Sequence, residues 1–129
     1  MRLRIGLLSI GLLVLGADGA QAQSPRTGRM MREKLVHSQT ILEALTTSNQ
    51  RLLAQETEAL ARIAESPQWT ADLRTPELRA YAESFIKTVA DLTAAARRHD
   101  LDAAAADYSA LTTACLQCHK RLKDLRIAN

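Results

Sequence analysis

Residues 100–125 read DLDAAAADYSALTTACLQCHKRLKDL and hold both cysteines of the chain in one pentapeptide, CLQCH. Asp100 is a favourable residue for capping the start of a helix, and alanine and leucine are strong helix formers. Apolar residues recur at spacings of three and four, in a stripe made of Tyr108, Leu111, Cys115, Cys118, Leu122 and Leu125. This stretch therefore predicts an amphipathic helix that carries Cys115, Cys118 and the adjacent His119.

The chain before this helix is also predicted to be helical. Capping residues and prolines predict helices over residues 24–47, 49–65 and 75–98. Proline disfavours helical geometry in the residue before it, so residues 66–74 are predicted to form a loop, in which Trp69 folds back over one end of the core.

Each of these three helices has its own apolar stripe. The predicted stripes are Met31, Leu35, Ser38, Leu42 and Leu45 in the first helix, Leu53, Thr57, Leu60 and Ala64 in the second, and Leu78, Ala82, Phe85, Val89 and Leu92 in the third. Amphipathic helices joined by short turns bury their stripes against one another. The sequence thus predicts an all-α fold, an antiparallel four-helix bundle whose C-terminal helix carries CLQCH.

Composition agrees with a single helical domain. The 129 residues include 47% hydrophobic and 24% charged residues, but few glycines and prolines for the turns of a β-sandwich. The formal charge of +3 is small, aromatic residues make up 3%, and there is no run of lysine and arginine. Nucleic acid is therefore not a predicted partner.

The first 22 residues have the pattern of a cleaved signal peptide. Arg2 and Arg4 precede an apolar run over residues 5–15, and Ala20-Gln21-Ala22 matches a signal-peptidase site. The apolar run is short for a membrane span. We expect an exported, periplasmic protein with its domain at residues 23–129 and no membrane span after cleavage.

The sequence CLQCH matches the CxxCH attachment motif of c-type haem. Two cysteines at i and i+3 lie on one side of a helix, where each thiol can add to a vinyl group as a thioether. His119 then follows as the proximal iron ligand. The alternatives are a disulfide or redox pair, which is strained within a regular helix, and a zinc site, for which no fourth ligand stands out.

The signal peptide, the four helices and the single CxxCH in the last helix together resemble class II c-type cytochromes, the cytochrome c′ family, and in particular its low-spin, methionine-ligated branch. The resemblance implies one covalent haem c, a basic residue four positions after the haem histidine, where Lys123 stands, and a distal residue on the first helix, near Met30 and Met31. The family often has an aromatic residue where this chain has Leu122.

The distal position is assigned by helix phase. Met31 is in phase with the predicted first stripe, and Met30 is rotated about 100° away from it. We therefore predict His119 and Met31 as the two iron ligands, with the alternatives that Met30 or no residue is the sixth ligand. High-spin family members have an apolar residue at this place and bind small gases.

Other candidate residues can be explained without a functional role. Arg26 and Arg29 either pair with a haem propionate or are ordinary surface charges, and His37 and His99 are interpreted as solvated surface histidines. No nucleophile–base pair or catalytic carboxylate pair is present, so no catalytic residue is predicted and the protein is not expected to be an enzyme.

The predicted function is electron transfer by a periplasmic mono-haem cytochrome. Its partners would be redox proteins that the sequence does not identify, and the chain would be a monomer or a homodimer. The alternative is a five-coordinate, gas-binding haem protein of cytochrome c′ type.

Overall fold

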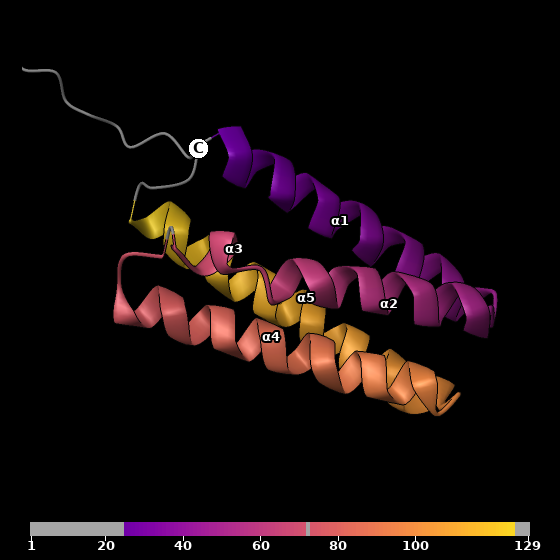
Figure 1. The fold of residues 1–129 in the computed structure, drawn as a ribbon. Coiled ribbons are helices and arrows are strands. Elements are labelled where there is room, and N and C mark those ends of the chain that lie inside the picture. The colour runs from indigo at the N-terminus through magenta and orange to yellow at the C-terminus, as the bar shows by residue number, and fades with distance from the viewer. Residues whose placement is uncertain (1–24, 72, 126–129) are drawn as a thin grey trace, which may run out of the picture.

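The computed structural model describes residues 25–71 and 73–125, and the regular structure of these residues is entirely helical (Figure 1). Five helices follow one another: α1 (Pro25–Thr46), α2 (Gln50–Ala64), α3 (Pro67–Ala71), α4 (Pro76–Arg97) and α5 (Leu101–Asp124). The all-α prediction is confirmed. The predicted signal peptide, residues 1–22, lies outside the described residues.

The four long helices begin and end close to the predicted positions, whereas the predicted loop at residues 66–74 is wrong in part. This loop contains the one-turn helix α3, which begins at Pro67 and includes Trp69. The backbone N–H of Trp69 donates to the carbonyl of Ser66 at 3.1 Å. Trp69 is only 5% exposed, so the short helix places a large indole ring in the core, as the sequence predicted for this residue.

The same kind of turn joins α1 to α2 and α4 to α5. One residue of each turn has a positive φ, 52° at Ser48 and 58° at His99. The next residue, Asn49 or Asp100, donates its backbone N–H to the preceding helix, and its side chain caps the following helix. The hydrogen bonds are Asn49 N to Ala44 O at 2.8 Å, Leu52 N to Asn49 Oδ1 at 3.1 Å, Asp100 N to Ala95 O at 3.1 Å, and Ala103 N to Asp100 Oδ1 at 3.0 Å.

We expect His99→Gly to stabilise the protein. The left-handed conformation at this position strains any residue with a Cβ atom, and the His99 side chain is exposed. The free energy of unfolding should rise by about 0.5–1 kcal/mol, measured by urea or thermal unfolding. His99→Ala is the matched control because alanine keeps the Cβ atom. Equal stability of the glycine and alanine variants would contradict this explanation.

The long helices pack in a sequence of neighbours. Helix α1 packs closely against α2, α2 against α4, and α4 against α5, while the contact between α1 and α5 is the sparsest of these four (Figure 1). The predicted stripes of α2 and α4 are confirmed. Their buried members are Leu53, Thr57, Leu60 and Ala64 in α2 and Leu78, Ala82, Phe85, Val89 and Leu92 in α4.

The predicted stripe of α1 is wrong by one residue. The buried residues of α1 are Met30, Lys34, Ile41 and Ala44. Leu35 and Leu42, which were predicted to face inward, are 58% and 47% exposed. The hydropathy pattern misplaced the stripe because a lysine occupies one of its central positions. A lysine reads as a surface residue in sequence, although its four-carbon stem packs readily against apolar neighbours.

Candidate haem-attachment site

The CLQCH motif lies in the C-terminal half of α5. Cys115 and Cys118 are free thiols and half-buried, and His119 is exposed. The predicted stripe of α5 is largely confirmed: Leu111 and Leu122 are buried, while Tyr108, Cys115, Cys118 and Leu125 are half-buried. Both thiols therefore lie at the edge of the packed interior, on the same side of the helix as its apolar stripe.

Burial also governs the chemistry of the two thiols. It raises the pKa of Cys115 and of Cys118, and the nearby amine of Lys34 opposes this rise at both positions. Both cysteines therefore remain protonated at neutral pH. Because the thiolate is the reactive form in thiol–disulfide exchange, this environment does not favour a redox-active cysteine pair.

Lys34 is the functional candidate that the sequence pattern missed. Its side chain is 7% exposed, and its Nζ lies 3.0 Å from the centroid of the Trp69 ring and 4.6 Å from that of Phe85. The two rings pack edge to face at 5.2 Å. Burial lowers the pKa of Lys34 to about 7, while the neighbouring Cys115 and Cys118 act in the opposite direction. One signal in the sequence was the position of Lys34, four residues after Met30 and seven before Ile41, which places the three side chains on one face of a helix.

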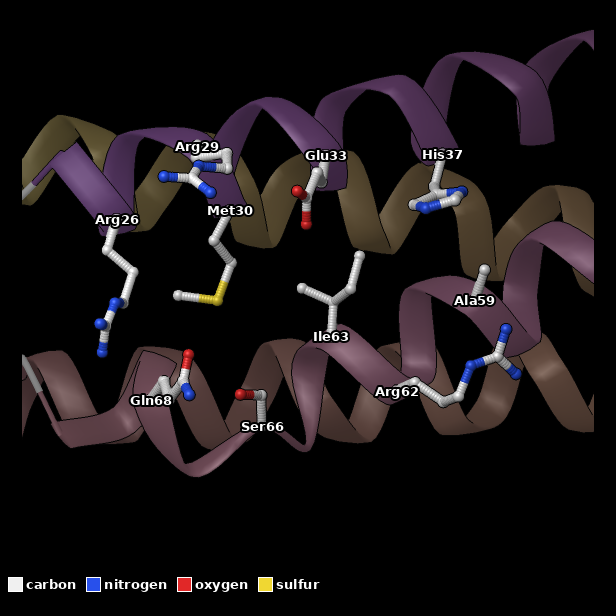
Figure 2. A pocket seen from close by; sticks show the side chains of 10 residues that line it. All are labelled: Arg26, Arg29, Met30, Glu33, His37, Ala59, Arg62, Ile63, Ser66 and Gln68. Carbon is white, nitrogen blue, oxygen red and sulfur yellow. The ribbon is translucent and has the colours of Figure 1, made fainter.

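A cavity of about 740 Å³ lies between α1 and the segment formed by α2 and α3 (Figure 2). Met30, which is 9% exposed, projects from α1 into this space. The lining residues are Arg26, Arg29, Met30, Glu33, His37, Ala59, Arg62, Ile63, Ser66 and Gln68. None of the CLQCH residues lines it. This space, which is open to solvent, is therefore separate from the cysteine motif.

Two sequence interpretations concern residues that line this cavity. Arg26 and Arg29 are exposed, and both reach its rim from α1 (Figure 2). The interpretation of His37 as a solvated surface residue is wrong, because His37 is half-buried and its Nδ1 lies 2.6 Å from Oε2 of Glu56. This pair joins α1 to α2. His99, by contrast, is exposed in its turn, as predicted.

The two methionines lie on different flanks of α1. The cavity-lining residues Arg26, Met30 and His37 mark the flank that faces α2. Met31 is about 100° further round the helix than Met30 and therefore lies away from this flank. Met31 is half-buried and packs against the core. The phase argument for Met31 thus fails as it was made, because the buried face of α1 holds Met30 and Lys34.

Within residues 25–71 and 73–125, no three His, Cys, Asp or Glu side chains gather into a group that would hold a metal ion. None of the helices described there is long and apolar enough to cross a membrane.

Comparisons with protein-family models, with curated proteins and with solved structures each found no match to this chain. Inferences about its function therefore depend on its own residues.

Proposed function

We propose that this protein is a periplasmic mono-haem c-type cytochrome that carries electrons. The observation that carries the proposal is the CLQCH motif on α5, with both thiols at the edge of the interior and on one face of the helix. In this proposal the four long helices form an antiparallel bundle of cytochrome c′ type, and residues 1–22 direct export and are removed.

The surroundings of the motif fit a haem in three respects. The contact between α1 and α5 is the sparsest among the neighbouring long helices. A large flat group inserted between these two helices would therefore disrupt the least helix–helix packing. The aromatic rings of Trp69 and Phe85 lie over the amine of Lys34, which interacts electrostatically with both thiols. The side chains of Leu35 and Leu42, on the same flank of α1 as Met31, are exposed apolar surface. A haem would cover such surface.

Each residue of the site has a defined task in this proposal. Cys115 and Cys118 would hold the haem through two thioethers, each formed by addition of an S–H group across a vinyl double bond with no leaving group. His119 would supply a nitrogen ligand to the iron, and Met31 a sulfur ligand from α1. Bound haem provides the one-electron ferric–ferrous couple. The helices orient it and exclude water, which sets the iron potential.

The decisive experiment is expression of the full chain together with c-type haem maturation machinery. The purified protein should have the mass of residues 23–129 plus one haem, a low-spin spectrum in both oxidation states, and a reversible one-electron titration. A protein at the apo mass would overturn the proposal. A haem-bearing protein that is high-spin and binds carbon monoxide would replace the electron carrier with the gas-binding alternative.

A further inference from the structure

The amine of Lys34 is buried and has no hydrogen-bond or ion-pair partner in the described part of the chain. Three polar or charged side chains are buried there: Lys34, Thr57 and Thr93. Both threonine hydroxyls donate to backbone carbonyls, Thr57 to Ala54 at 3.1 Å and Thr93 to Val89 at 2.8 Å. The Nζ of Lys34 has no hydrogen-bond partner among the described residues.

Within residues 25–71 and 73–125, no carboxylate is paired with this amine. On the neighbouring helices, Glu56 is bonded to His37, Glu58 to Arg97, and Glu77 to Arg121. Glu33, one residue before Lys34, is exposed and lines the cavity on the α2 side. The faces of Trp69 and Phe85 attract the ammonium of Lys34. This attraction is weaker than the free-energy cost of removing an ammonium group from water.

A lysine that stayed unpaired at this position would be a net cost to folding. Replacement of a buried charge by an apolar residue of similar size is often stabilising. Lys34 also lies close enough to Cys115 and Cys118 to influence the pKa of both thiols. No residue of the described chain supplies an anion for this amine, whereas a group attached at the two cysteines would bring one within its reach.

We propose that the ammonium of Lys34 forms an ion pair with a propionate carboxylate of the haem attached at Cys115 and Cys118. This inference rests on the proposed function, because the haem brings the carboxylate. Lys34 stands three residues, about 4.5 Å, beyond Met31 along α1. The two side chains thus have different tasks: Met31 reaches the iron, and the longer Lys34 side chain reaches a group at the edge of the porphyrin.

The test is the midpoint potential of the haem-bearing protein with Lys34→Leu and Lys34→Arg. Loss of the cation leaves a carboxylate uncompensated beside the iron, which favours the ferric form. Lys34→Leu should therefore raise the ferric-to-ferrous ratio at a fixed applied potential about tenfold, a fall of about 59 mV for one electron. Lys34→Arg keeps the charge and should stay within about twofold of the parent protein. Both variants should remain low-spin.

Lys87→Leu is the matched control, since Lys87 is an exposed lysine paired with Asp91 on α4 and should leave the potential unchanged. If the leucine variant fails to accumulate, Lys34→Gln against Lys34→Arg makes the same comparison. An unchanged potential in the uncharged variant overturns the inference, and so does a high-spin, carbon monoxide-binding spectrum, which would identify Lys34 as an iron ligand. Absence of covalent haem in the parent protein would instead overturn the proposed function.

Discussion

The double variant Cys115→Ser, Cys118→Ser is expected to lose covalent haem completely. Each thioether requires one thiol, and both cysteines of the chain lie in CLQCH. After expression with maturation machinery, the mass of the double variant should equal that of the apo chain, and acid–acetone extraction should remove any pigment. Each single variant should keep one thioether and show a shifted α-band in the reduced spectrum.

Leu116→Ser provides the control for this experiment. Leu116 lies between the two cysteines and is 66% exposed, so its replacement leaves the thiols and the core in place. This variant should carry haem as the parent protein does. Haem that survives extraction from the double variant would show that attachment does not depend on these cysteines, and the central assignment would then be wrong.

Met31→Leu is expected to convert the iron from six- to five-coordinate. Met31 is half-buried against the core, and leucine has a similar volume but no sulfur to donate. The ferric protein should lose the weak near-infrared band of sulfur ligation, and the ferrous protein should change from no binding of carbon monoxide to one molecule per haem. The midpoint potential should fall, because methionine ligation favours ferrous haem.

Met30→Leu is the paired control. Met30 projects into the cavity on the α2 side, so its replacement should leave the spectrum of the iron nearly unchanged (Figure 2). In the opposite result, Met30→Leu would make the iron five-coordinate and Met31→Leu would have no effect. That result would identify Met30 as the sixth ligand. A parent protein that already binds carbon monoxide would show that neither methionine is a ligand.

Helix limits and two of the buried stripes followed from the sequence because their causes are local. Thr75 caps α4 through a 3.1 Å hydrogen bond from the N–H of Leu78, and Pro76 occupies the first turn, as the sequence signal predicts. In α2 and α4 the buried positions hold apolar residues and one threonine, so hydropathy and burial agree. Local capping chemistry and helical periodicity were sufficient for these elements.

Local sequence patterns did not predict the contacts between segments that are far apart in the chain. The pair of His37 with Glu56 joins residues 19 positions apart, and each residue alone reads as a surface group. The short helix α3 was hidden because five residues give too little periodicity to detect. In both cases the partner that makes burial favourable lies on another helix.

The sequence by itself determined the helical class, the main helix boundaries and the haem-attachment motif as the centre of the functional hypothesis. The tertiary structure alone decided which face of α1 turns inward. That face holds Lys34, whose burial depends on Trp69 from α3 and Phe85 from α4. Hydropathy counts a lysine as exposed because it scores the residue without its surroundings. Only the folded chain brings the two aromatic rings over the amine, and their attraction offsets part of the free-energy cost of its burial.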